Sequence, residues 1–140
     1  MIEPAQVWLP VWAGPAASGR MERVPVRVLI VDDHSSFRSS ARLLLEAEGY
    51  EVVGEAETGG DGLRAAAELS PDVVLLDVHL PDIDGFDVAA RIATGTTAPR
   101  VVITSSRDAS DFGAAISRSG ALGFVPKNEL SGEALAALLG

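Results

Sequence analysis

The feature that most constrains this chain is a regular alternation, from Val26 onward, of short apolar runs with segments whose apolar residues recur at helical spacing. Nearly continuous apolar runs are typical of strands buried on both faces of a parallel sheet. The pattern predicts buried strands at Asp72–Leu76, Arg100–Thr104 and Val26–Val31. A more polar strand at Glu51–Glu55 is expected at an edge, and a fifth strand at Leu122–Val125.

Each predicted strand is followed by a segment with the spacing of an amphipathic helix. These helices are expected at Ser35–Glu48, Gly60–Leu69, Phe86–Ala93, Ser110–Arg118 and Leu130–Leu139. Five strand-then-helix units joined by short links predict a doubly wound α/β fold. Right-handed crossovers between parallel strands then place helices on both faces of the sheet.

Residues 1–25 differ from the rest of the chain, because they hold four of the eight prolines and both tryptophans without helical or strand periodicity. We predict a disordered extension there and one domain over residues 26–140. The alternative is a partner-binding motif anchored by the tryptophans. Met21 is a second candidate start, so the extension could also reflect the choice of start codon.

Charge and composition exclude several classes of function. The net charge of −9 predicts a poor nucleic-acid binder, because affinity for DNA depends largely on neutralising phosphates. The chain has no cysteine, which excludes disulfides and thiolate metal sites. It has neither a membrane-length apolar run nor the pattern of a signal peptide, so we expect a cytoplasmic protein without a membrane partner.

Polar side chains follow the predicted buried strands at the point where each strand ends. Asp32 and Asp33 follow the first strand, Asp77 the third, Ser105 the fourth, and Lys127 the fifth. In such sheets ligands collect beyond the carboxyl ends of the strands. Lys127 is the only lysine, beside ten arginines.

These residue types together fit phosphoryl transfer to an aspartate. Three clustered carboxylates repel one another unless they share protons or bind a cation, and an oxygen-only ligand set suits Mg²⁺. Aspartate can act as a nucleophile toward phosphorus, and a metal, a lysine ammonium and a serine hydroxyl can offset the charge on the phosphoryl oxygens. Asp77, Lys127 and Ser105 are the candidates for these roles.

Each residue also has a structural interpretation when it is taken alone. Asp33 or Ser35 could cap the next helix, Asp77 could be a turn residue, and Lys127 could be a solvated lysine. Thr104 and Phe124 fit plain structural positions. His34 and His79 lack a partner at ligand spacing, so neither side chain is expected to bind metal. The adjacent acids together with a third acid after another strand are not explained by capping.

Four motifs in order resemble the receiver domain of two-component response regulators, of the LuxR/NarL type. They are Val28-Leu-Ile-Val-Asp-Asp33, Leu75-Leu-Asp77-Val-His-Leu-Pro81-Asp-Ile-Asp-Gly85, Val102-Ile-Thr-Ser-Ser106 and Gly123-Phe-Val-Pro-Lys127. The resemblance runs from about Val26 to about Leu139. It implies a flavodoxin-like (βα)5 fold with a parallel five-stranded sheet in the order 2-1-3-4-5.

The resemblance also implies a role for each matching residue. Asp77 matches the phosphoacceptor, and Lys127 matches the lysine that pairs with the phosphoryl group. Asp33 matches the direct Mg²⁺ ligand, Asp32 an acid that acts through water, and His79 a ligand through its backbone carbonyl. The remaining matches are the switch residues Ser105 and Phe124. Phe124 replaces the tyrosine frequent there, and Asn128 replaces a frequent proline.

By this resemblance the phosphoryl donor is a sensor histidine kinase, and the chain is not an enzyme beyond the chemistry of its own aspartate. Phosphorylation is expected to reshape the surface of the fourth helix, fifth strand and fifth helix, where partners, including a second copy in a homodimer, would bind. Because the sequence stops at Gly140, we expect a stand-alone receiver. The alternative is a receiver fragment of a LuxR/NarL-type DNA-binding regulator.

Two other classes share features with the chain. A Mg²⁺-dependent aspartyl phosphatase would place a second acid two residues after its nucleophile, where this chain has His79. A flavodoxin-like cofactor binder would carry a Ser-, Thr- and Gly-rich phosphate loop after the first strand, where this chain has Asp32 and Asp33. Both interpretations are weaker than the receiver interpretation.

Overall fold

A computed structural model describes residues 24–95 and 98–140 of the chain. Within these ranges the strands form one five-stranded parallel sheet in the order β4-β3-β5-β6-β7, which confirms the expected 2-1-3-4-5 order. The strands are β3 (Arg27–Val31), β4 (Glu51–Ala56), β5 (Val73–Asp77), β6 (Arg100–Ser105) and β7 (Gly123–Pro126). The polar strand β4 lies at one edge, as its composition predicted.

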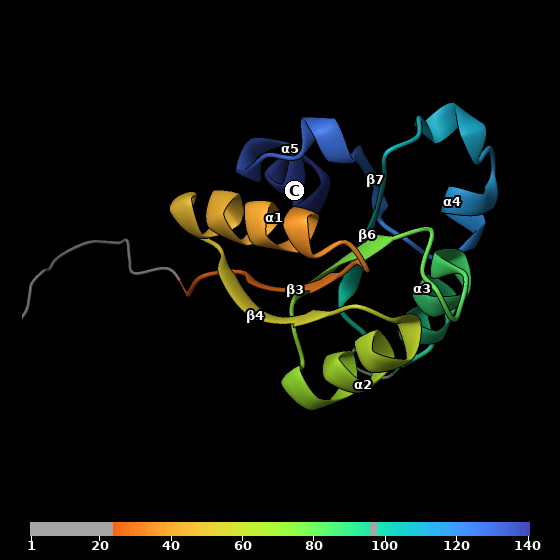
Figure 1. Ribbon diagram of the computed structural model, residues 1–140, viewed down its shortest axis with the longest axis horizontal. Coiled ribbons are helices and arrows are strands. Elements are labelled where there is room, and N and C mark those ends of the chain that lie inside the picture. The colour runs from red at the N-terminus through yellow and green to blue at the C-terminus, as the bar shows by residue number, and fades with distance from the viewer. Residues whose placement is uncertain (1–23, 96–97) are drawn as a thin grey trace, which may run out of the picture.

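Helices cover both faces of this sheet, as Figure 1 shows, with α1 and α5 on one side and α2 and α3 on the other. The helices are α1 (Ser35–Ala47), α2 (Gly59–Leu69), α3 (Gly85–Ala93), α4 (Ala115–Arg118) and α5 (Gly132–Leu139). Two short 3₁₀ segments, η1 (Ala109–Asp111) and η2 (Lys127–Glu129), lie after β6 and β7. In the described ranges no helix has both the length and the apolar character needed to cross a membrane.

The central strands are buried on both faces, which explains why their sequences read as continuous apolar runs. In β3, Val28 and Ile30 pack in the cluster under α1 and α5, whereas Leu29 and Val31 pack in the cluster under α2 and α3. All four side chains are fully buried. Burial of each such side chain contributes about 1.5–3 kcal/mol. These two clusters therefore fix β3 between the helices on the two faces of the sheet.

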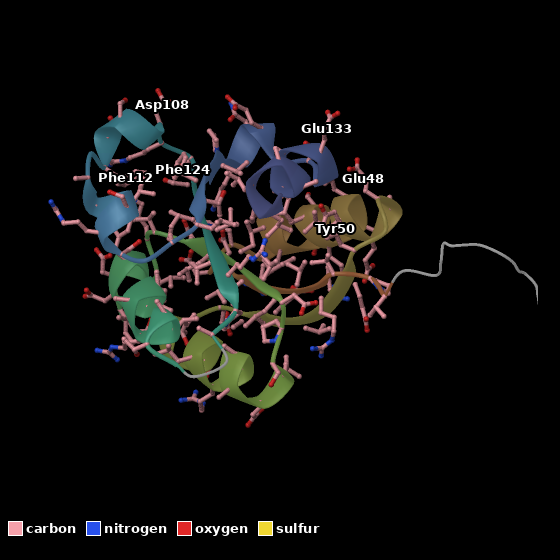
Figure 2. The ribbon with its side chains drawn as sticks, turned by 180° about the vertical axis from the view of Figure 1, so that it is seen from behind. Glu48, Tyr50, Asp108, Phe112, Phe124 and Glu133 are labelled. Carbon is pink, nitrogen blue, oxygen red and sulfur yellow. The ribbon has the colours of Figure 1, made fainter. Side chains whose placement is uncertain are left out.

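The helix boundaries follow from local side-chain capping. Thr58 and Ser131 each accept a hydrogen bond from a backbone N–H three residues on, at the start of α2 and α5. Gly49, with φ of +95°, follows α1 at the predicted stop, in a conformation that favours glycine. The Tyr50 hydroxyl donates to the Gly132 carbonyl at 2.8 Å and ties the end of α1 to the start of α5, beside Glu48 and Glu133 in Figure 2.

The predicted continuous helix Ser110–Arg118 is wrong over its first half. The structure has the 3₁₀ segment η1, then a turn, and only then the short α4. Gly113 has φ of +55°, which interrupts a right-handed helix. The Asp111 carboxylate accepts a hydrogen bond from the Asp108 N–H, so this turn satisfies its own polar groups. The predicted helix from Leu130 begins instead at Gly132, because Ser131 caps it.

The predicted disordered extension cannot be compared with the structure, since residues 1–23 lie outside the described residues. Val24 and Pro25 are described, and they precede β3 without regular structure. The proposed boundary between an extension and a domain near residue 26 stays a prediction.

Candidate functional site

Two buried aspartates lie at the carboxyl ends of neighbouring strands. Val31 of β3 and Leu76 of β5 are partners in the parallel register, so Asp32 and Asp77, the next residues, emerge side by side. Asp32 is fully buried and Asp77 is 2% exposed. Asp77 is the last residue of β5 rather than the first of the following loop, because the strand runs one residue past its predicted end at Leu76. The backbone of Asp32 is held by its N–H, which donates to the Ala56 carbonyl of β4 at 2.9 Å.

Lys127, the only lysine of the chain, lies beside these carboxylates. It follows the end of β7, and its Nζ lies 2.7 Å from Asp32 Oδ2 and 3.7 Å from Asp77 Oδ2. Its side chain is 15% exposed. Lys127 therefore faces both buried acids at once, although the nearer partner is Asp32.

The charges at this edge are not fully compensated. Burial raises the pKa of Asp77, and the neighbouring charge of Asp32 raises it further, while Lys127 opposes the change. Oδ2 of Asp77 is buried and accepts no hydrogen bond from the described residues, and Oδ2 of Asp32 has the Lys127 ammonium as its close partner. Buried carboxylate oxygens without a donor are available to a cation.

The same edge gathers a set of possible metal-binding atoms. One atom from each of Asp32, Asp33, His34 and Asp77 lies within 4.8 Å of all the others. The donors from the three acids are hard oxygen atoms, which Mg²⁺ prefers. The buried Asp77 oxygen atom without a hydrogen bond, together with this donor set, fits a Mg²⁺ ion.

His34 was not expected at the cluster, and the structure places its ring there. Its Nδ1 lies 3.1 Å from Asp32 Oδ1 and 3.2 Å from Asp33 Oδ1, and its backbone N–H donates to Asp32 Oδ1 at 2.8 Å. The available signal was its position two residues after Asp32, where an aspartate side chain often accepts a backbone hydrogen bond. The prediction that neither histidine side chain binds metal stays untested.

Ser105 and Thr104 end the neighbouring strand β6, and both are fully buried. Ser105 is the register partner of Pro126, the residue before Lys127, and its Oγ accepts a hydrogen bond from the Arg107 N–H at 3.1 Å. Thr104 is the register partner of Asp77, and its Oγ1 has no hydrogen-bond partner among the described residues. Ser105 therefore lies at the same sheet edge as the acids, turned toward its own loop.

The loop after β5 is anchored at both ends. Asp82 accepts hydrogen bonds from the N–H groups of Gly59 and Gly60, at the start of α2, at 2.8 and 2.9 Å. These two bonds, that of Gly60 first, lower the pKa of Asp82. At the other end the Gly85 N–H donates to the Val78 carbonyl at 2.9 Å. The segment that carries His79 is thereby held against the sheet.

Gly85 is needed where α3 begins, because the backbone of β5 passes very close to it. A Cβ at this position would meet the Asp77 carbonyl oxygen and lie 2.7 Å from Val78 Cα. These are backbone atoms, so they cannot yield as a flexible side chain would. The glycine of the Asp84-Gly85 pair thus sets how closely α3 approaches the strand that ends in Asp77.

An aromatic cluster connects this loop to β7. The ring of Phe112 lies 6.2 Å from that of His79, 5.5 Å from that of Phe86 and 5.8 Å from that of Phe124, measured between centroids. Figure 2 shows Phe112 and Phe124 as neighbours on this side of the molecule. Phe124 is half-buried in this packing. The sequence predicted a role for Phe124 and placed Phe112 on the output surface, but it did not predict the contact between the two rings, because Phe112 lies in the segment wrongly expected to be helical.

Arg38 of α1 contacts the backbone of the site at Asp32, and this contact was not predicted from the sequence. Its Nη1 donates to the Asp32 carbonyl at 2.6 Å, and its Nε donates to Glu55 at 3.0 Å. Arg42 also donates to Glu55, at 2.7 Å. The hydrogen bond from Arg42, followed by that from Arg38, lowers the pKa of Glu55. This pairing links α1 to β4 next to Asp32.

Comparison with known proteins agrees with this geometry. The profile of the "response regulator receiver domain" family matches residues 28–139. The chain belongs to the response regulator receiver domain family. Receiver domains are signalling modules that partner with histidine kinases and downstream effectors, and they generally bind Mg²⁺ at an acidic pocket.

Similar proteins combine such a receiver domain with other parts. BvgA of Bordetella pertussis, described as a positive transcription regulator of virulence factors, is 43% identical over 103 residues, which are 74% of this chain and 49% of BvgA. A protein-glutamate methylesterase/protein-glutamine glutaminase of Myxococcus xanthus is 46% identical over 105 residues, which are 74% of this chain and 30% of that protein. The receiver domain spans about half the length, or less, of these relatives.

A solved structure shows the same fold. A LuxR-family two-component response regulator from Aurantimonas sp. SI85-9A1 superposes with a TM-score of 0.74 at 32% identity, covering 83% of this chain and 86% of that one. The likeness of this receiver domain to the LuxR type, expected from its motifs, is thus confirmed.

Proposed function

We propose that this receiver domain accepts a phosphoryl group on Asp77 from a phosphohistidine of a sensor histidine kinase. The observation that carries the proposal is the buried Asp77 carboxylate at the end of β5, with an oxygen atom that accepts no hydrogen bond and faces the only lysine at 3.7 Å. The other acids at this edge supply a cation site beside it. Because the kinase presents its phosphohistidine in the cytoplasm, the proposal also places the chain there.

The residues that would hold Mg²⁺ are Asp33 and Asp77 directly, Asp32 through water, and His79 through its backbone carbonyl. When bound, Mg²⁺ offsets the negative charge of the carboxylates and of the incoming phosphoryl group. This set agrees with the cluster of Asp32, Asp33 and Asp77 oxygen atoms within 4.8 Å. His34 lies in the same cluster and orients Asp32 and Asp33 through its contacts with both.

In the transfer step a carboxylate oxygen of Asp77 attacks the phosphorus atom of the phosphohistidine. The new P–O bond forms as the P–N bond breaks, and the bonding pair stays with the leaving imidazole, which takes up a proton from solvent. Lys127 donates to a phosphoryl oxygen, and the Ser105 hydroxyl donates to another. The later attack of water on the aspartyl phosphate releases inorganic phosphate and restores Asp77.

The phosphorylated state is read out through the surface made by α4, β7 and α5. Ser105 leaves its contact with the Arg107 N–H when it turns to the phosphoryl group, and Phe124 turns inward into the vacated space. Because the Phe112 ring packs 5.8 Å from that of Phe124, this rotation displaces the segment that carries η1 and α4. The resulting change of shape would control binding of a downstream protein.

A second candidate is the same switch acting as the receiver half of a LuxR/NarL-type DNA-binding regulator. It is favoured by the similarity to BvgA, of which the matched residues are 49%. The codons that follow Gly140 in the gene distinguish the two, because a regulator of this type would continue into a basic helix-turn-helix region. A Mg²⁺-dependent phosphatase is the weakest alternative, and it requires steady turnover of small phosphate esters.

The test is incubation of the full chain with acetyl phosphate and Mg²⁺, followed by intact-mass measurement. We expect one phosphoryl adduct that base removes and that does not form when EDTA replaces Mg²⁺. Asp77→Asn should abolish the adduct, whereas Asp87→Asn, an exposed acid in α3, should retain it. The proposal fails if the natural chain stays unlabelled under conditions that label another receiver, or if Asp77→Asn is labelled equally well.

A further inference from the structure

Phe37 is an aromatic residue at the site to which no role has yet been given. It lies in the first turn of α1, and the centroid of its ring is 4.6 Å from Lys127 Nζ. The ring is half-buried and packs against the cluster under α1 and α5. A cation within about 6 Å of an aromatic ring centroid is attracted by the ring quadrupole.

Lys127 needs such a contact because its side chain is long and flexible. An ammonium group on a four-carbon chain loses more rotamer entropy than most side chains when it is fixed in one place. In this structure Asp32, 2.7 Å away, supplies the nearest charge. That contact weakens once a divalent cation competes for the charge of Asp32, so it cannot hold Lys127 throughout the reaction.

The Phe37 ring provides a contact that does not depend on the charge of a carboxylate. A phenyl ring neither titrates nor binds Mg²⁺ in water, so its attraction for the ammonium persists whether the acids are free, metal-bound or phosphorylated. The helix also fixes the ring, because α1 begins directly after the Asp33-His34 pair. One short segment thus sets the positions of the acids and of the ring.

We propose that Phe37 is a positioning residue, which holds the Lys127 ammonium above the carboxylate cluster through a cation–π contact. The inference rests on the proposed role of Lys127 toward the phosphoryl group. The competing interpretation is that Phe37 fills the core under α1 and has no effect on Lys127. Leucine at this position would keep most of the apolar contact and remove the aromatic ring.

The chain allows a direct test of the contact, because Lys127 is its only lysine. Protein grown with lysine labelled with ¹³C at the ε carbon gives one lysine signal in a carbon–proton NMR spectrum. In the natural chain and in Phe37→Tyr we expect this signal to be displaced upfield by the ring current. In Phe37→Leu it should move to the position of free lysine. Phe86→Leu is the matched control, because Phe86 lies in α3 against Phe112 and should leave the signal unchanged.

The functional arm measures phosphorylation by phosphoramidate at saturating Mg²⁺. We expect Phe37→Leu to lower the rate by about three- to tenfold, and Phe37→Tyr and Phe86→Leu to keep it within about twofold. In a Lys127→Met background, Phe37→Leu should have no further effect. Calorimetric Mg²⁺ titration and urea unfolding of each variant separate this effect from loss of metal binding or of folded protein.

The possible outcomes distinguish this inference from the proposed function. If Phe37→Leu leaves the lysine signal where it is in the natural chain, the contact is absent and the inference is overturned. If the signal moves but the natural chain and Phe37→Leu are phosphorylated at equal rates, the positioning role is overturned. If the natural chain is never phosphorylated, the proposed function fails, and with it the positioning role, while the NMR result still decides the contact.

Discussion

The ammonium nitrogen of Lys127 lies 2.7 Å from a carboxylate oxygen of Asp32, and this is 1.0 Å closer than its 3.7 Å distance to Asp77. The lysine that we propose to act on the phosphoryl group therefore compensates a different acid in the structure described here. Asp32 is fully buried, and Lys127 is the cation nearest to its carboxylate.

Removing Lys127 should destabilise the metal-free protein. In Lys127→Met the buried Asp32 charge loses its nearest cation, and breaking a buried ion pair from one side costs about 3–5 kcal/mol. We expect urea unfolding in EDTA to show a loss of about 3 kcal/mol, and Mg²⁺ to restore more stability to the variant than it adds to the natural chain. Arg64→Met, which removes an exposed cation paired with Asp61, should change stability by less than about 1 kcal/mol. Equal losses for the two variants would contradict the account.

Removing the charge of Asp77 should have the opposite effect. Burial, and next the charge of Asp32, raise the pKa of Asp77 in the folded state, so its ionised form opposes folding. This penalty is complete above the raised pKa and disappears as the pH falls below the unfolded value. Asp77→Asn should therefore stabilise the metal-free protein at neutral pH by about 1–2 kcal/mol in urea unfolding, with a smaller gain in acid. A destabilised Asp77→Asn would show that the carboxylate is better compensated than the structure indicates.

Glu55 should stabilise the folded protein near neutral pH and lose this contribution in acid. The hydrogen bond from Arg42, and then that from Arg38, lower its pKa in the folded state. The contribution is present above the unfolded pKa and is lost as the pH falls through the lowered folded pKa. Glu55→Gln should cost about 0.5–1 kcal/mol near neutral pH and nothing in strong acid, when unfolding is followed by circular dichroism. Glu133→Gln, an exposed acid on α5, serves as the control. A cost that does not vary with pH would rule out the charge pairing as its source.

Gly85→Ala should disturb both the fold and the site. The added Cβ would meet the Asp77 carbonyl oxygen and approach Val78 Cα to 2.7 Å, so α3 must move away from β5. Overpacking of this kind costs about 1–3 kcal/mol, and the shift should also weaken Mg²⁺ binding measured by calorimetry. At Gly60, by comparison, an added Cβ would have a side-chain oxygen of Asp82 as its nearest atom, at 3.3 Å and not a backbone atom, so Gly60→Ala should cost less than Gly85→Ala. Similar stabilities for the two variants would mean that the close approach at Gly85 is not required.

The sheet and the carboxylate edge could be predicted from sequence because they depend on short-range patterns. Continuous apolar runs identify buried strands, and parallel strands bring their carboxyl ends to one edge, which is enough to place Asp32, Asp77 and Lys127 together. The broken helix after β6 was not predicted, because a single glycine at positive φ, Gly113, overrides the apolar spacing. Rotamers and long-range packing decide the remaining details, such as the contact of His34 with two carboxylates and of Phe37 with Lys127.

The central claim, that Asp77 itself carries the phosphoryl group, is tested most directly by trapping the acyl phosphate. Borohydride reduces an aspartyl phosphate to homoserine, and tandem mass spectrometry of the proteolytic peptide that spans Asp77 then identifies the residue. After incubation with a phosphoryl donor and Mg²⁺, we expect homoserine at position 77 and at no other acid, and none when EDTA is present. Trapping at Asp32 or Asp33 instead, or at no position in a chain that gains the mass of a phosphoryl group, would contradict it.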